Sequence, residues 1–174
     1  MRIMQQKLIN SLYISFILIL ISLSASAAED LKSIGKFKDW ETFTLTENNN
    51  KVCFAQSIPI LRAPKKFERN PSRLFVSFRP AEDIKDEVSA TSGYTFQEEK
   101  TIKAKSGKKT FDFFTKENFA WILDIEEEQK FIKAMKKASR LMIIGRTNKG
   151  KQTIDHYSLM GFSKAYDAAK KNCS

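Results

Sequence analysis

The chain has 174 residues, a formal net charge of +10 at pH 7 and two cysteines, and 42% of its residues are hydrophobic. This length favours one domain that buries roughly 70% of its unfolded surface, and no internal repeat, low-complexity tract or Pro/Gly/Ser-rich linker divides it. The basic charge is compatible with an anionic partner: lipopolysaccharide, a phospholipid surface, an acidic glycan or nucleic acid. The alternative is that a lysine-rich chain reflects an AT-rich genome.

A secretory signal peptide is predicted for residues 1–27. Arg2 and Lys7 supply a positive start, an apolar run covers residues 12–23, and residues 25–27 (ASA) supply the small side chains of a cleavage site. The alternative is an uncleaved membrane anchor. The apolar run is about 12 residues long, however, whereas roughly 20 residues are needed to span a bilayer.

Removal of this segment leaves one exported domain of residues 28–174, with a net charge of +8 and no transmembrane segment. A protein outside the cytoplasm rarely meets nucleic acid, so we expect no nucleic-acid partner. An oxidising compartment favours a disulfide between Cys53 and Cys173, with two free buried thiols as the alternative. A two-cysteine metal site is disfavoured because His156 is the only histidine, and we expect no metal and no cofactor.

The first half of the domain is predicted to form β-strands. Residues 40–46 (WETFTLT) and 52–58 (VCFAQSI) are rich in aromatic and β-branched side chains, and residues 47–51 form the turn of a hairpin. A basic connection interrupted by prolines follows, and residues 73–79 (RLFVSFR) form a third strand. Period-two alternation places on one face of that strand Leu74, Val76 and Phe78.

The second half combines short strands with two helices. Weaker strand patterns cover residues 88–96, 101–104, 110–114 and 120–123. Asp124 and Glu127 form a capping-box pattern that begins an amphipathic helix. An apolar strand at 141–145 forms a second hairpin with residues 153–160, and a last helix follows. The apolar side of that helix is predicted to hold Phe162, Ala165, Tyr166, Ala169 and Cys173. This pattern favours a mainly β fold, a β-sandwich with two short helices.

The sequence has no catalytic motif: it lacks a Gly-x-Ser-x-Gly elbow, a phosphate-binding glycine loop, a His-Glu-x-x-His and a Cys-x-x-Cys. Asp155 and His156 are neighbours in a predicted strand, so they point to opposite faces and do not form part of a triad. The carboxylates at 126–128 fan out around a helix and predict a solvated helix start. The acidic residues between 82 and 87 lack the order of an EF-hand and predict a charged connector. We expect that the protein is not an enzyme.

Basic residues beside aromatic ones suggest an anionic-surface contact. Phenylalanines at 67, 111, 113 and 114 are interleaved with them. The alternative is that the lysines are solubility charges over core phenylalanines. The candidate contact residues are Lys65, Lys66, Arg69, Arg73, Lys105, Lys108 and Lys109.

Several short motifs occur in a distinctive order. A signal peptide precedes Phe37-Lys38-Asp39-Trp40, then Cys53-Phe54-Ala55-Gln56, then a helix leading into an apolar strand (131–144), and finally Ser158-Leu159-Met160-Gly161-Phe162-Ser163-Lys164-Ala165. In this order the chain resembles the invasion-associated locus B (IalB) family of exported proteins of Gram-negative bacteria. The resemblance implies an immunoglobulin-like β-sandwich, a periplasmic or outer-surface location and no enzymatic activity. Many family members carry a further cysteine pair just before the helix, and this chain does not.

These features together predict a non-catalytic envelope protein that acts as a binding or structural module, with an unknown and possibly anionic envelope component or protein as its partner. The alternative function is a periplasmic chaperone or carrier of a lipid or other apolar ligand, suggested by the 14 phenylalanines. A role in the invasion of host cells is a sub-hypothesis that the family's name alone suggests.

Overall fold

The computed structural model describes residues 30–97 and 100–174, so the predicted signal peptide lies outside the described residues. The described strands form one antiparallel sheet in the order β1-β2-β3-β5-β6-β9-β8-β7-β10-β11-β4. Their bounds are β1 Lys32–Phe37, β2 Trp40–Glu47, β3 Asn50–Ser57, β4 Leu61–Ala63, β5 Arg73–Arg79, β6 Ile84–Thr91, β7 Thr101–Ser106, β8 Lys109–Lys116, β9 Phe119–Trp121, β10 Arg140–Arg146 and β11 Gln152–Ser158. The two α-helices are α2 Ile125–Lys137 and α3 Phe162–Asn172.

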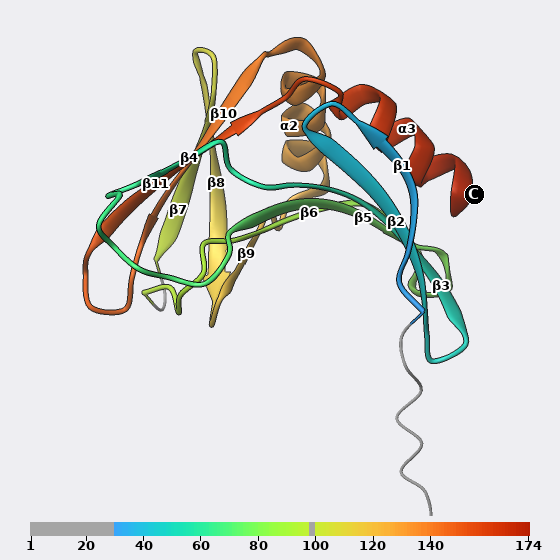
Figure 1. Ribbon diagram of the computed structural model, residues 1–174, viewed down its shortest axis with the longest axis horizontal. Coiled ribbons are helices and arrows are strands. Elements are labelled where there is room, and N and C mark those ends of the chain that lie inside the picture. The colour runs from blue at the N-terminus through green and yellow to red at the C-terminus, as the bar shows by residue number, and fades with distance from the viewer. Residues whose placement is uncertain (1–29, 98–99) are drawn as a thin grey trace, which may run out of the picture.

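The sheet bends where β6 meets β9, so that it has two halves (Figure 1). Strands β1, β2, β3, β5 and β6 form one half, and the remaining strands form the other. Both helices lie on the same side of the sheet (Figure 1), and side chains from both halves and both helices form one apolar core. The prediction of a mainly β fold with two short helices is confirmed, and the two layers of the expected sandwich are the two halves of one continuous sheet.

Most strands follow the predicted alternation. β2 and β3 form the first hairpin and β10 and β11 the second. β5 has the predicted bounds, and all three of its predicted inward residues are buried, namely Leu74, Val76 and Phe78. Two short edge strands, β1 and β4, were not predicted, because neither shows apolar alternation.

The predicted charged connector at 82–87 is wrong in its second part. A 3₁₀ turn at Pro80–Glu82 is followed directly by β6, which begins at Ile84. Asp86 and Glu87 therefore belong to a strand, and Asp86 is buried. Asp86 has a φ of 65° beside an irregularity in the β5–β6 pairing, and this local bulge turns its carboxyl toward the helices.

Helix α2 begins where its sequence predicts, and the predicted last helix is α3, which ends at Asn172, one residue before Cys173. The side chain of Asp124 accepts a hydrogen bond of 2.8 Å from the backbone N–H of Glu127, which caps α2. A disulfide between Cys53 and Cys173 joins the end of α3 to β3 across 120 positions of sequence, as expected. Neither helix of the described chain is long and apolar enough to cross a membrane.

Candidate functional site

The sequence motifs from the two ends of the domain meet in space. The indole Nε1–H of Trp40 donates a hydrogen bond of 2.9 Å to the carbonyl oxygen of Ser158, and the backbone N–H of Asp39 donates one of 3.3 Å to that of Met160. The rings of Trp40 and Phe162 lie 4.8 Å apart between centroids. We call these five residues the motif junction. Trp40 and Phe162 are each only 1% exposed, so the rings of the junction belong to the core.

Gly161 permits this close approach. It has a φ of 95°, and a Cβ atom at this position would lie 1.8 Å from the carbonyl oxygen of Phe37. Any other residue would have to push β1 away from α3. Nearby, the hydroxyl of Thr42 donates to the carbonyl oxygen of Ala165 at 3.0 Å, which holds α3 against β2. These contacts give the C-terminal motif a structural role.

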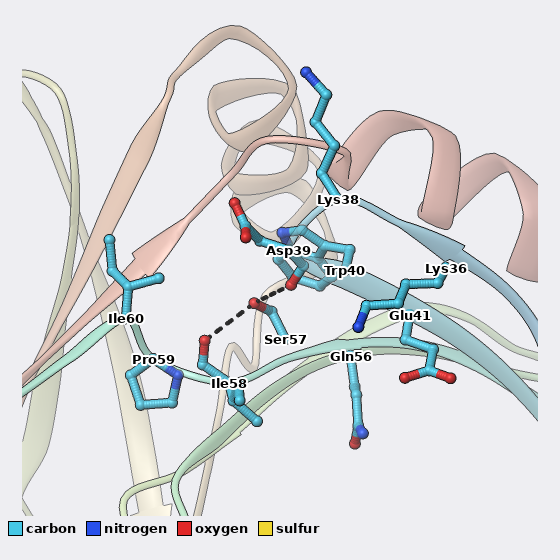
Figure 2. A pocket seen from close by; sticks show the side chains of 10 residues that line it. All are labelled: Lys36, Lys38, Asp39, Trp40, Glu41, Gln56, Ser57, Ile58, Pro59 and Ile60. Atoms are coloured by element: carbon cyan, nitrogen blue, oxygen red, sulfur yellow. Dashed lines mark hydrogen bonds between the residues drawn. The ribbon is translucent and has the colours of Figure 1, made fainter.

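A hollow of about 310 Å³ opens beside the motif junction (Figure 2). The hydroxyl of Ser57 donates to the carbonyl oxygen of Asp39 at 2.8 Å and closes one side of it. Lys38 extends away from the other labelled side chains (Figure 2). The hollow is lined by side chains of mixed charge and by aliphatic ones: Lys36, Lys38, Asp39, Trp40, Glu41, Gln56, Ser57, Ile58, Pro59 and Ile60. This mixture presents no convergent set of groups for catalysis.

The opposite face of the sheet carries a row of aromatic side chains that neither helix covers. Their strand positions alternate with buried core positions, so they point away from α2 and α3. The rings of Phe43 and Phe54 stack at 5.3 Å, and Phe75 meets Phe54 edge-on at 5.9 Å. On the other half, Trp121 stacks between two rings, at 5.2 Å and 5.5 Å between centroids. We call this set the outer aromatic face; its members are Phe43, Phe54, Phe75, Phe114, Phe119 and Trp121.

A slot of about 370 Å³ separates the two groups of rings. Along one row of the sheet, Phe75 pairs with Ser89 and Ser89 pairs with Trp121. Two strand spacings of about 4.8 Å therefore place the two aromatic side chains roughly 10 Å apart. The small side chains of Ser77 and Ser89 lie at the bottom of the slot and leave space above them.

A larger hollow of about 550 Å³ adjoins the slot and shares Trp121 with it. Leu123 and Ile125, which flank the start of α2, are each 76% exposed at its edge, the highest exposure of any large apolar side chain in the described chain. Exposed apolar side chains in such a group are typical of a binding site. We call it the Trp121 hollow; it is lined by Asp83, Ile84, Lys85, Glu87, Phe114, Lys116, Trp121, Ile122, Leu123, Ile125 and Glu128.

Glu128 supplies the buried ionisable group of the Trp121 hollow. It is 7% exposed, and its Oε1 accepts a hydrogen bond of 2.6 Å from the backbone N–H of Val88. Burial raises the pKa of Glu128 to about 7; the Val88 hydrogen bond opposes this rise, and the charges of Glu87 and Asp86 add to it. A carboxyl group with a raised pKa in an apolar hollow is a typical feature of functional sites. The sequence predicted a solvated helix start and did not identify this buried group. Only the fold shows that, of the three consecutive glutamates, Glu128 is the one that faces inward.

The structure does not bring the candidate basic residues together. Lys108 and Lys109 lie at the β7–β8 hairpin, whereas Lys65 and Lys66 follow β4 at the opposite end of that half of the sheet (Figure 1). Of the remaining candidates, Lys105 is exposed and Arg73 half-buried. The anionic-surface contact of these residues therefore stays a prediction, and its two clusters are separate.

The prediction that Arg69 belongs to the anionic-surface contact is wrong, because its side chain is only 1% exposed and pairs with the fully buried Asp155. Its Nη1 donates at 2.9 Å to Asp155 Oδ2 and at 2.6 Å to the carbonyl oxygen of Ser92. Asp155 occupies an inward position of β11 while His156 is half-buried on the other face, as the alternation predicted. A charged residue at an inward strand position requires a partner, but the sequence did not show that this partner is Arg69.

Comparison with known proteins agrees with the resemblance seen in the motifs. The family model described as invasion associated locus B (IalB) protein matches residues 40–170. The crystal structure of invasion associated protein B from Bartonella henselae is similar in fold, with a TM-score of 0.57 and 14% sequence identity over 81% of this chain and 98% of that one. No curated protein matches the chain. Because the family model spans most of the domain, this chain belongs to the IalB family.

Proposed function

We propose that this protein is a non-catalytic binding module of the bacterial envelope and that it holds its partner on the outer aromatic face. The observation that carries the proposal is the position of the helices. Both lie on the core side of the sheet (Figure 1), so within the described part of the chain no helix covers the row of aromatic side chains on the other side. Aromatic residues are enriched at the centres of binding interfaces because they supply large, rigid contact areas.

Two features support export as part of this proposal. The N-terminal segment has the charge, the apolar run and the cleavage site of a signal peptide. The disulfide between Cys53 and Cys173 suits an oxidising compartment, where such bonds persist. Cell fractionation followed by N-terminal sequencing tests this: we expect a periplasmic or surface product that begins at Ala28.

Site-specific photo-crosslinking tests the binding face. A photoreactive residue at Phe119, on the outer aromatic face, is expected to form an adduct with an envelope component in intact cells. The same residue at Lys164, exposed on α3 on the opposite side, is the matched control. Adducts from Lys164 in place of Phe119 would contradict the proposal.

A second function is favoured by the Trp121 hollow, whose volume of about 550 Å³ lies in the range of small-ligand sites. In this case the protein carries a small ligand with an apolar body. Native mass spectrometry of protein purified from envelope fractions distinguishes the two functions. A small molecule that co-purifies with the wild-type protein, but not with the Leu123→Ser variant, supports the carrier function.

A further inference from the structure

Glu128 lacks a countercharge. Oε1 accepts the Val88 hydrogen bond, whereas among the described residues none donates to Oε2, and none of their ion pairs includes this carboxylate. The side chain is more than nine-tenths buried and lines the Trp121 hollow. A carboxylate that has lost most of its water and has no cation is strongly disfavoured, so a cation placed there gains more than it would at an exposed acid.

The neighbouring groups increase this demand for positive charge. On β6, Asp86 accepts hydrogen bonds from Gln129, at 2.7 Å, and from the hydroxyl of Tyr166, so this second buried carboxyl is held by neutral donors. Burial, followed by the hydrogen bond to Asp86, raises the pKa of Tyr166, which keeps its hydroxyl neutral. Glu87 also lies close to Glu128, and its charge is shared with Arg79, 2.9 Å away.

The two lysines of the hollow do not supply the missing charge. Lys85 pairs with Asp83 at 2.8 Å in the mouth of the hollow, and both side chains are exposed to water. Lys116, on β8, is also exposed and remains hydrated. The buried carboxylate of Glu128 is therefore the group that most strongly favours a ligand of positive charge.

Apart from Glu128 and the charged side chains at its mouth and rim, the hollow has an apolar wall. Leu123 and Ile125 flank the opening, and Phe114 and Ile122 line its wall. A ligand that gave only a cation would leave these side chains in water, whereas a short alkyl chain would cover them. The site therefore combines an acidic anchor with an apolar wall.

We propose that the Trp121 hollow binds an organic cation: an ammonium group on an alkyl chain, with the ammonium at Glu128 Oε2 and the chain along Leu123 and Ile125. This inference rests on the second of the functions proposed above and adds the ligand class. The ammonium belongs to a free amine or to the headgroup of an aminophospholipid, and the test separates these two sources.

The test uses three six-carbon probes on the full mature domain, followed by NMR titration of the Val88 amide and the Trp121 indole N–H. Hexylammonium is expected to bind best, because it adds a charged hydrogen bond to Glu128. Hexanol lacks this charge and is expected to bind more weakly by about tenfold. Hexanoate is expected to bind least, because its carboxylate is repelled by Glu128. Glu128→Gln keeps an acceptor for Val88 and is expected to remove the preference for the amine. Glu126→Gln, an exposed change on the same helix turn, is expected to leave it intact.

The amine preference should also depend on pH. In the ligand-free folded protein the pKa of Glu128 is raised to about 7. The affinity for hexylammonium should therefore rise as the pH rises through 7 and level off above it, whereas the affinity for hexanol should not depend on pH in this way. Leu123→Ser, at an exposed position, is expected to weaken the binding of all three probes. It serves as a second variant if Glu128→Gln does not fold. Cosedimentation with vesicles that contain phosphatidylethanolamine, but not with vesicles of phosphatidylcholine alone, would place the ammonium on a lipid; binding of hexylammonium alone would place it on a soluble ligand.

Three results would overturn the inference. Tighter binding of hexanoate than of hexylammonium would assign the hollow to an anion held by Lys85 and Lys116. Equal binding of hexanol and hexylammonium would keep the hollow as an apolar site and remove the cation. Failure of all three probes would reject the binding site itself, and with it the carrier function, while photo-crosslinking at Phe119 would still test the outer aromatic face.

Discussion

Trp40 and Trp121 occupy regions with opposite roles. Trp40 is buried at the motif junction, where its indole N–H and its ring connect the N-terminal and C-terminal motifs. Trp121 lies half-buried on the outer aromatic face, stacked between two phenylalanines and bordering two hollows. The first region joins the N-terminal and C-terminal motifs by which the family is recognised, whereas the second contains only Phe54 of one motif.

This difference shows that the family motifs mark how the domain is assembled. Glycine at 161 and tryptophan at 40 are needed because backbones and rings meet there at close range. A binding face has fewer such requirements, since half-exposed aromatic side chains tolerate exchange. We therefore expect stability to depend mainly on the motif junction and partner choice mainly on the outer aromatic face.

The largest expected contrast is between the two tryptophans. Trp40→Ala is expected to lower the free energy of unfolding by about 3–5 kcal/mol, because it leaves a core cavity and removes the partner of the Ser158 carbonyl. Trp121→Ala, whose ring is half-exposed, is expected to lower it by about 1 kcal/mol. Urea denaturation followed by circular dichroism measures both. Equal losses would remove the distinction between the two regions.

The disulfide strengthens the motif-junction side, because it fixes the end of α3 to β3. Replacement of both Cys53 and Cys173 by alanine is expected to lower the free energy of unfolding by about 2–4 kcal/mol, since the unfolded chain loses a long closed loop. The wild-type urea midpoint should fall to that of the double variant when reductant is added. A midpoint unaffected by reductant would mean that the thiols are free.

Gly161 tests the close approach of β1 and α3. Gly161→Ala is expected to lower the free energy of unfolding by about 2–3 kcal/mol, because of the clash with the Phe37 carbonyl and the positive φ. Gly107→Ala is the matched control, since Gly107 has a φ of 59° and open space around it, and it should lose only about 1 kcal/mol. Similar losses in both variants would show that the backbone conformation, and not the contact with β1, determines the effect.

The substitution of Glu128 in the Trp121 hollow is expected to change stability in the opposite direction. Burial raises the pKa of Glu128 from 4.5 to about 7, so the folded protein keeps a proton that the unfolded chain releases. Stability from this group therefore falls as the pH rises from 4.5 to about 7 and is constant above. Glu128→Gln is expected to raise the free energy of unfolding by about 1–3 kcal/mol at pH 8 and to change it little at pH 4.

The control for this pH dependence is Glu126→Gln, at an exposed position of the same helix turn, which should change stability little at either pH. Thermal unfolding across the pH range measures both variants. A destabilised Glu128→Gln at pH 8 would mean that the carboxylate already has a favourable partner in the folded protein.

Local patterns predicted most of the strands and both helices. β5 follows its alternation because every second residue is apolar, and α2 begins where Asp124 can cap it. β1 escaped prediction because its lysines and its glycine interrupt the alternation of an edge strand that packs on one side only. β4 has three residues and becomes a strand only because β11 lies beside it.

By itself the sequence indicated the family, the export signal, the disulfide partners Cys53 and Cys173 and the strand and helix periods, because most of these follow from neighbouring residues or from motif order. Tertiary structure alone decided which charges are buried. The bend of the sheet and the packing of α2 place Glu128 in the Trp121 hollow and Arg69 against Asp155. Burial depends on residues that are distant in sequence, so Glu126 and Glu128, two positions apart in the same helix turn, acquire different roles.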